Sequence, residues 1–196
     1  MNPILNTNIY FIKEHVGIFK AANNYDIFDP ESNKLILECR EEGLNLITKI
    51  LRFTDFKTLT PFNIAIKTAD GKTILTVKRS FSLFLSRVEV YNENNDHIGS
   101  FKQKFFSIGG RFDVLDPKDN YLCQLKGKWT SWEFSFTNEN EEYALVTKKW
   151  AGLGKELFTS ADNYVLQINN NVQENNPIRM LILAAVLCID MVLKEK

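Results

Sequence analysis

The sequence predicts a mainly β protein, a closed barrel of twelve antiparallel strands that encloses a hydrophobic C-terminal α-helix. Three observations lead to this prediction. Segments with alternating apolar and polar residues recur in pairs around short polar turns, which is the pattern of β-hairpins. The 196 residues include fifteen Phe, a residue type that favours strands and a bulky interior. Residues 180–193 are apolar apart from Asp190, as in a helix that protein surrounds on every side.

The strands follow one theme along the chain. A first strand is predicted over 8–13, five hairpins follow, and a last strand precedes the helix. Pro30, Pro61 and Pro117 lie in turns or before strands, where no ladder hydrogen bond is lost. The predicted hairpins pair 25–28 with 34–40, 62–66 with 73–78, 87–91 with 97–103, 112–115 with 121–126, and 132–137 with 142–150, and the last strand is 163–168.

Two segments fit this theme less well. Residues 43–60 have apolar side chains at 46, 47, 50, 51 and 53, close to helical spacing, so a short helix and a strand with a loose connection both remain open. Residues 105–110, the second of these segments, are predicted to form a flexible link between hairpins that carries two bulky rings, Phe105 and Phe106.

The predicted helix and strands complement each other, because the apolar helix needs to be covered and the lumen of the barrel needs to be filled. Twelve strands that close into a barrel hide their edges, but they leave a lumen too wide for side chains alone to fill. A helix over about 177–194 would fill it. The alternative is a membrane span, but fourteen residues reach only about 21 Å, short of a hydrocarbon core of roughly 30 Å. We therefore expect one barrel domain over residues 1–196.

Composition limits the classes of partner and compartment. Lys and Arg number 24, and so do Asp and Glu, so no overall field attracts nucleic acid, and any anion binding must come from local clusters. Cys39, Cys123 and Cys188 lie far apart in the sequence, which predicts reduced thiols without a disulfide framework. The N-terminal residues lack the pattern of a cleaved signal peptide, so we expect a cytoplasmic protein.

The sequence contains few residues in patterns typical of catalytic sites. His15 and His97 have no neighbours at triad or metal-site spacing, and both are expected on the surface. Asp116 and Asp119 are explained by turn chemistry. Asp190 lies near the helix end, where Lys194 or backbone N–H groups can satisfy it, although a buried charge that binds a ligand is the other interpretation. We expect no enzyme, no catalytic residue, no metal and no cofactor.

The stretch KKWAGLGKELFTSADNYVLQINNN, followed by the apolar helix, resembles the phospholipid scramblase family. The end of the helix, LAAVLCID, resembles the family's helix including its terminal Ile-Asp, and weaker correspondence covers residues 25–127. The residues in matching places are Lys148 or Lys149, Trp150, Gly152, Lys155, Glu156, Thr159, Ala161, Asp162 and Asn163.

The resemblance implies a tubby C-terminal-like (LURP-one-related) fold, a twelve-stranded barrel threaded by a helix, and lipid scrambling as the family activity. One departure concerns calcium. The acidic calcium segment of eukaryotic members corresponds to residues 160–171, where Asp162 carries the one charge, so we expect no calcium site. The Pro-rich arm and the palmitoylated cysteine cluster of those proteins are also absent from this sequence.

Basic and aromatic residues suggest a lipid-binding surface, because Lys binds phosphate and Trp settles at membrane interfaces. Phe105 and Phe106 are candidates for a shallow insertion loop beside Lys102, Lys104 and Arg111, and Trp132 lies in the same basic and aromatic part of the sequence. The lipid-binding candidates are Lys126, Lys128, Trp129, Lys148, Lys149, Trp150 and Lys155.

These residues predict peripheral binding of anionic phospholipid head groups at the inner membrane face. The competing interpretation is that the Trp side chains pack in the barrel and the Lys side chains are solvated. In that case the chain is a soluble binding module for a protein or a small ligand. A single-span scramblase is a third, minor hypothesis.

Overall fold

The computed structural model describes residues 2–15, 22–51, 53, 60–81, 87–104, 111–128, 131–139, 141–148 and 163–189. Several candidate residues lie outside these ranges: Phe105, Phe106, Trp129, Lys149, Trp150, Lys155 and Asp190.

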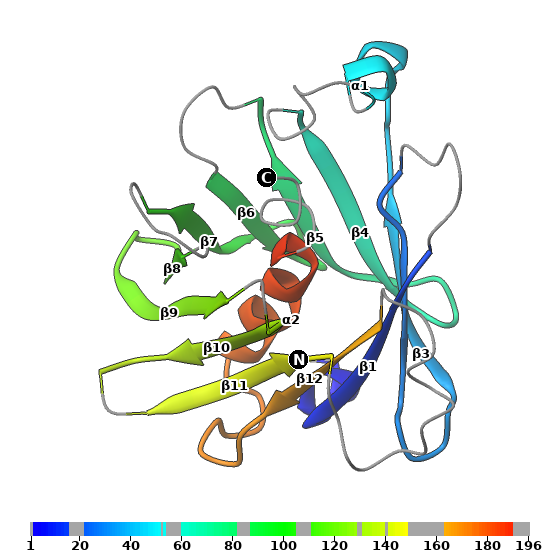
Figure 1. Cartoon of the computed structure of the whole chain (residues 1–196). Coiled ribbons are helices and arrows are strands. Elements are labelled where there is room, and N and C mark those ends of the chain that lie inside the picture. Colours follow the sequence, from blue (N-terminus) through cyan, green and yellow to red (C-terminus); the bar gives the residue numbers. More distant parts are fainter. Residues whose placement is uncertain are drawn as a thin grey trace.

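The described residues form twelve strands in one closed antiparallel barrel (Figure 1), as predicted. Each strand pairs with its neighbours in sequence, and the first strand also pairs with the last. The strands are β1 (Ile9–Glu14), β2 (Tyr25–Phe28), β3 (Leu35–Glu41), β4 (Phe62–Thr68), β5 (Thr73–Arg79), β6 (Arg87–Asn92), β7 (His97–Gln103), β8 (Arg111–Leu115), β9 (Tyr121–Lys128), β10 (Glu133–Thr137), β11 (Glu142–Thr147) and β12 (Asn163–Ile168).

The strand boundaries agree closely with the sequence pattern, and the exceptions have local causes. Strand β10 begins at Glu133 and not at Trp132, because Trp132 has φ 49°, a left-handed conformation that a strand does not contain. Strand β11 ends at Thr147, and residues 149–150 of the predicted strand lie outside the described ranges. Strand β9 runs two residues further than predicted, to Lys128.

The predicted central helix is α2 (Ile178–Cys188), which lies inside the ring of strands (Figure 1). Residues 181–189 are each at most 2% exposed. The barrel therefore surrounds the helix, which explains why its side chains are apolar on every face. It packs against β5, β6, β7 and β12. The predicted residues 190–194 of this helix lie outside the described ranges.

Gly99 on β7 permits the close contact between barrel and helix. A Cβ at this position would lie 2.4 Å from the carbonyl oxygen of Leu115 and 3.0 Å from both methyl groups of Leu181 on α2. Its φ of 153° is also unfavourable for a residue with a side chain. Glycine therefore lets the helix approach the barrel wall.

An antiparallel barrel places alternate connections at the same end, so this barrel has two different ends. We call one the turn end: it carries the short connections 29–34, 69–72, 93–96, 116–120 and 138–141, together with the segment 169–177 that leads into α2. We call the other the loop end, where the connections are 15–24, 42–61, 80–86, 104–110, 129–132 and 148–162. Helix α2 begins at the turn end and runs towards the loop end.

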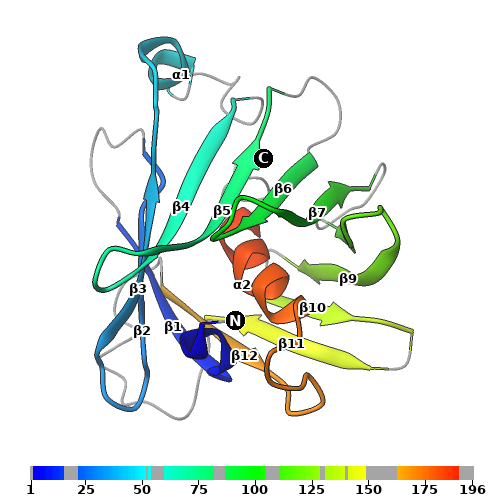
Figure 2. The same cartoon turned by 180° about the vertical axis from the view of Figure 1, so that it is seen from behind.

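A buried arginine fastens the start of α2 to the N-terminal segment. Arg179 is 1% exposed. Its guanidinium donates hydrogen bonds to oxygens just before β1 and just after β12, the two strands that close the barrel. The segment it holds includes the 3₁₀ helix η1 (Pro3–Asn6), which lies beside the first turn of α2 (Figure 2). The acceptors are the carbonyl oxygens of Leu5, Asn6, Thr7 and Val172 and the side-chain oxygen of Asn8.

The open question about residues 43–60 is resolved in favour of a helix. Helix α1 (Leu46–Leu51) lies at the loop end, away from α2 (Figure 1). The side-chain oxygen of Asn45 accepts a hydrogen bond of 2.8 Å from the backbone N–H of Thr48, which satisfies one donor of the first turn. Residues 52 and 54–59 lie outside the described ranges.

Candidate lipid-binding surface

The sequence candidates that the structure describes lie towards the loop end. Lys126 is exposed on β9, and its backbone pairs with Arg111 of β8 and Ser135 of β10. Lys128 ends β9 and pairs with Glu133. The other candidates of this set, Trp129, Lys149, Trp150 and Lys155, lie outside the described ranges.

Lys148 follows β11, and an aromatic stack fixes its position. Its Nζ lies 3.7 Å from the ring centroid of Trp132, a cation–π contact. Trp132 in turn stacks on Tyr164, with ring centroids 5.8 Å apart and an interplanar angle of 6°, and meets the ring of Phe134 edge-on. Trp132 thus packs on the barrel, as the competing interpretation expected, while it holds a lysine ammonium at the loop end.

The barrel register brings together two groups of basic residues that are separate in the sequence. The backbone N–H of Lys104 donates a 3.0 Å hydrogen bond to the carbonyl oxygen of Arg111, where the connection 105–110 leaves the barrel. Arg111 is in turn paired with Lys126 on the next strand. Lys102, Lys104, Arg111 and Lys126 are all exposed. Asp113 lies among them and forms a 3.0 Å ion pair with Lys104, so a basic excess remains on β7, β8 and β9.

Exposed apolar side chains also gather at the loop end. Three lie on or just after α1, namely Leu46 (72% exposed), Ile50 (58%) and Phe53 (62%), and Phe81 (55%) follows β5. Large apolar groups that remain in water next to one another mark a surface that contacts a partner or a membrane. These four residues are not among the candidates that the sequence pattern indicated. The helical spacing over 43–60 was the available signal, but it does not tell which face of a short helix is covered.

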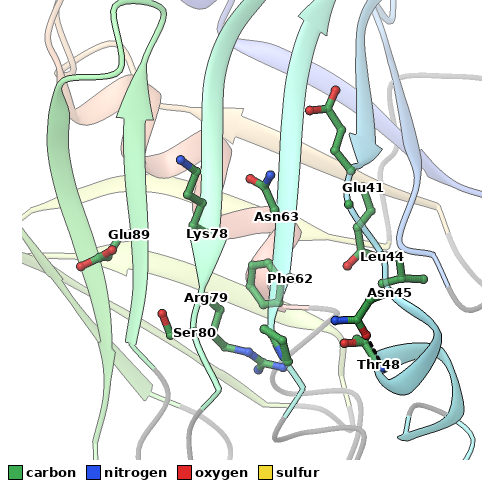
Figure 3. Close-up of a pocket in the computed structure, with 13 residues that line it drawn as sticks. Glu41, Leu44, Asn45, Thr48, Phe62, Asn63, Lys78, Arg79, Ser80 and Glu89 are labelled. Atoms are coloured by element: carbon green, nitrogen blue, oxygen red, sulfur yellow. Dashed lines mark hydrogen bonds between the residues drawn. The ribbon is translucent and has the colours of Figure 1, made fainter.

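A cavity of about 380 Å³ lies on the outer face of the barrel, between α1 and strands β3 to β6 (Figure 3). Lys78 projects from β5 beside it, with its Nζ 4.7 Å from the ring centroid of Tyr91. Asn63 lies next to Lys78 on β4, and its buried Oδ1 has no hydrogen-bond partner in the described part of the chain. Ser80 and Glu89 complete this row of polar groups.

Arg79, at the base of the same cavity, has a structural role. Its guanidinium is buried and donates hydrogen bonds from Nε (3.1 Å) and Nη2 (2.5 Å) to the carbonyl oxygen of Thr60. It also lies over the ring of Phe62, 4.7 Å from the centroid. Arg79 therefore ties the connection 42–61 to the barrel, and Lys78 is the cation that faces the cavity from this strand.

Charge is distributed unevenly between the two ends of the barrel. The connections at the turn end hold ten acidic residues and three lysines, so their formal charge is −7. Because the whole chain has no net charge, all other residues together carry +7. The residues concerned are Asp29, Glu31, Asp70, Glu93, Asp96, Asp116, Asp119, Glu139, Glu141 and Glu174, with Lys34, Lys72 and Lys118.

The two histidines lie in an ion pair or beside an aromatic ring, and the three cysteines are buried in the core. His15 contacts Asp26 (2.7 Å), which also pairs with Arg40 (2.7 Å), on the outside of the barrel. The predicted surface position suits His15, whereas the Nε2 of His97 is buried beside Tyr91. Burial raises the pKa of all three Cys thiols, that of Cys123 to about 12. In the described residues no three His, Cys, Asp or Glu side chains are grouped as metal ligands would be.

The described helices are too short or too polar to cross a bilayer.

Comparison with known proteins agrees with the resemblance seen in the sequence. A family model described as Scramblase matches residues 6–196. The phospholipid scramblase family protein C343.06c of Schizosaccharomyces pombe is 24% identical over 217 residues, which cover 99% of this chain and 57% of that protein. Altered inheritance rate of mitochondria protein 25 of Saccharomyces cerevisiae is 26% identical over 192 residues, which cover 85% of this chain and 58% of that protein.

The chain thus spans less than two thirds of the length of these relatives. Among solved structures, the X-ray structure of the Arabidopsis thaliana protein AT5G01750 superposes with a TM-score of 0.57 at 14% identity, covering 97% of this chain and 96% of that one. This likeness supports the tubby-like barrel and carries no information about activity. The match of the family model over nearly the whole sequence shows that this chain belongs to the scramblase family.

Proposed function

We propose that this scramblase-family chain binds the surface of anionic phospholipid membranes peripherally, without covalent catalysis, and that the loop end of the barrel makes the contact. The observation that carries the proposal is the shared location of exposed apolar and basic residues. Leu46, Ile50, Phe53 and Phe81 are exposed at the end towards which Arg111 and Lys126 also lie. The opposite end is acidic, so an anionic surface repels it and orients the barrel.

The expected affinity is modest and sensitive to salt. Each Lys or Arg close to an anionic leaflet contributes about 1 kcal/mol, so Lys102, Arg111, Lys126 and Lys148 together contribute about 4 kcal/mol. Burying one large apolar side chain such as Phe53 adds up to about 1.5–3 kcal/mol. Electrostatic attraction and shallow insertion are both needed, because neither is strong enough alone to hold a protein stably on a membrane.

The cavity beside α1 is our candidate for a single head group. The Lys78 ammonium suits a phosphate oxygen, and the unpartnered Oδ1 of Asn63 suits a hydroxyl or ammonium donor of the same head group. Phospholipid scrambling is the activity that the family name implies, and we propose that binding at the loop end is the part of that activity which this chain performs. Phe105, Phe106, Trp129, Lys149, Trp150 and Lys155 remain candidates in this contact.

Sedimentation with liposomes tests the proposal. The chain should pellet with vesicles that contain phosphatidylserine at low salt and stay in solution with pure phosphatidylcholine vesicles. Replacing Arg111 and Lys126 by Glu removes two positive charges, which costs about 2 kcal/mol, or roughly 30-fold in affinity, before the repulsion of the new carboxylates is counted.

The matched control changes the net charge equally at the turn end, by Lys34→Glu with Lys118→Glu. This variant should pellet almost as the parent does. Reversal at Lys126, Lys128, Lys148 and Lys149 should abolish binding while the urea transition persists. If the two double variants bind equally, or if the parent never pellets, the chain is better described as a soluble binding module.

A further inference from the structure

A second and larger cavity, of about 680 Å³, opens at the turn end of the barrel beside the first turn of α2. Its walls are apolar side chains of α2 and of the strands β7, β9 and β11. Ile98, Leu122, Tyr143 and Ile178 are half-buried there, Leu181 lies at its floor, and Tyr121 is 49% exposed. This volume is within the range of about 300–1,000 Å³ that is usual for ligand pockets.

The cavity exists because the mouth of the barrel is filled on one side only. On the side of β1 and β12, η1 covers the start of α2 (Figure 2), with Leu5 2% exposed and Arg179 bound to its carbonyl oxygens. The hydroxyl of Tyr10 secures the same segment by a 2.9 Å hydrogen bond to the carbonyl oxygen of Ile4. On the side of β7 to β11 the described chain supplies no comparable cover, and the apolar wall faces solvent.

Several polar groups around the cavity already form hydrogen bonds within the described part of the chain. The Oδ1 of Asp116 accepts hydrogen bonds from the backbone of Lys118 and Asn120, and the Nδ2 of Asn171 donates to the carbonyl oxygen of Glu142. The first N–H groups of α2 are satisfied too, since Ile178 donates to the Oδ1 of Asn176. The backbone N–H groups of Arg179 and Met180 donate to the carbonyl oxygens of Asn176 and Pro177. These three N–H groups of the helix N-terminus are thus not available to a phosphate or carboxylate, and the apolar lining suits an apolar group.

The cavity lies at the acidic turn end, and Asp116 lines it. The turns 93–96, 116–120 and 138–141 carry six acidic residues and one base, Lys118; Glu142 follows the last of these turns, and Glu174 lies in the segment 169–177, part of which lines the cavity. Two of these acids are paired, Glu93 with Lys72 and Asp119 with Arg87. Asp96, Glu139 and Glu141 form no ion pair within the described residues. An apolar group that enters the cavity is therefore favoured when positive charges flank it.

We propose that this cavity docks a basic segment of another protein, which inserts an apolar or aromatic side chain between Leu122, Ile178 and Leu181 while its Lys or Arg residues face the acidic turns. Charge complementarity argues against a lipid as the occupant, because the acidic turns around the cavity repel an anionic membrane. The cavity and the proposed membrane contact lie at opposite ends of the barrel, so both can be occupied at once.

Selection from a phage-displayed library of random peptides on the purified chain tests this inference. Enriched peptides should combine one or two large apolar residues with flanking Lys or Arg. A labelled enriched peptide should shift the methyl resonances of Ile98, Leu122 and Leu181 in NMR spectra. Its affinity, measured by fluorescence anisotropy, should fall about tenfold with Tyr121→Ser and again with Glu139→Lys plus Glu141→Lys, and high salt should weaken it.

Matched controls separate the site from general effects. Leu46→Ser removes an exposed apolar side chain at the loop end, and Glu31→Lys reverses an exposed acid on the far side of the turn end, so both should leave peptide affinity unchanged. The inference is overturned if no peptide is enriched or if the enriched peptides lack this composition. It is equally overturned if the cavity variants bind the peptide with the affinity of the parent chain. It is also overturned if Tyr121→Ser abolishes pelleting with phosphatidylserine vesicles, which would make the cavity a lipid site. Loss of vesicle binding in the Arg111 and Lys126 variant leaves this inference untouched.

Discussion

Replacing Arg179 tests how the start of the central helix is held. Arg179→Met removes five hydrogen bonds, of which two are fully buried, from Nε to the Leu5 carbonyl oxygen (2.9 Å) and from Nη1 to the Val172 carbonyl oxygen (2.6 Å). A buried bond to a charged donor is worth about 1.5–3 kcal/mol. Water can reach the other three acceptors, at Asn6, Thr7 and Asn8, so their loss costs less.

The desolvation of the guanidinium works in the opposite direction, because methionine has no charge to strip of water. We therefore expect Arg179→Met to lower the free energy of unfolding by about 3 kcal/mol. This is a large share of the roughly 5–15 kcal/mol of a typical domain. In urea it corresponds to a midpoint shift of about 1 M. Arg179→Lys should cost about 2 kcal/mol, since an ammonium has three donors for five acceptors.

Arg40 provides the matched control, because it also donates hydrogen bonds to backbone carbonyl oxygens, those of Tyr25 and Cys39, but on the outer face, where it is 29% exposed. Arg40→Met should cost about 1 kcal/mol. Equal midpoint shifts for the two methionine variants would refute the reasoning that burial of the Arg179 cluster sets its contribution.

Two further predictions concern the barrel wall and its acid stability. Gly99→Ala should lower the free energy of unfolding by about 3 kcal/mol, because its Cβ meets Leu115 and Leu181. Gly71→Ala, at φ 87° but with nothing within 4 Å, should cost only about 1 kcal/mol in the same urea experiment; similar losses would show that backbone strain alone matters. Burial works to raise the pKa of Asp26, but hydrogen bonds from His15 and Arg40 outweigh it and hold the pKa below 3.8. The stability that this gives is present above pH 3.8 and lost as the pH falls further, so the urea midpoint of Asp26→Asn should change less than the parent's between neutral pH and about pH 3. Parallel pH curves would exclude Asp26 as a source of acid lability.

Much of the fold was predictable because the barrel leaves a local trace in the sequence. Each strand buries one face, so alternation marks it. Several short turns need residues that tolerate left-handed backbone, and Asn33, Asn95 and Asp119 supply three of them with φ between 52° and 64°. The helix was predictable because an apolar run as long as 180–193 must be enclosed. Trp132 misled the boundary of β10, since an aromatic residue favours strands and nothing in the sequence announces its positive φ.

The candidate sites were harder to predict because they depend on register and on partial covering. Arg111 and Lys126 are distant in sequence and meet only through the pairing of β8 with β9. The role of Arg179 was within reach, since a charge in the first turn of an apolar helix needs acceptors, but four of its five acceptors lie more than 170 positions earlier in the chain. The turn-end cavity exists because η1 covers only one side of the start of α2. The hydrophobic periodicity of the sequence does not show how far such a cover extends.

The pairing of β1 with β12 has a consequence for the order in which this protein can fold during synthesis. Strand β1 is synthesised first, but one of its two partners, β12, is synthesised last among the strands. The hydrophobic helix α2, which fills the barrel, is synthesised after β12. Until α2 emerges, the inner faces of the twelve strands have no helix to enclose. Such long-range closure makes folding slow, and the waiting chain is prone to aggregate. We therefore expect the nascent chain to need a chaperone until residue 189 has left the exit tunnel.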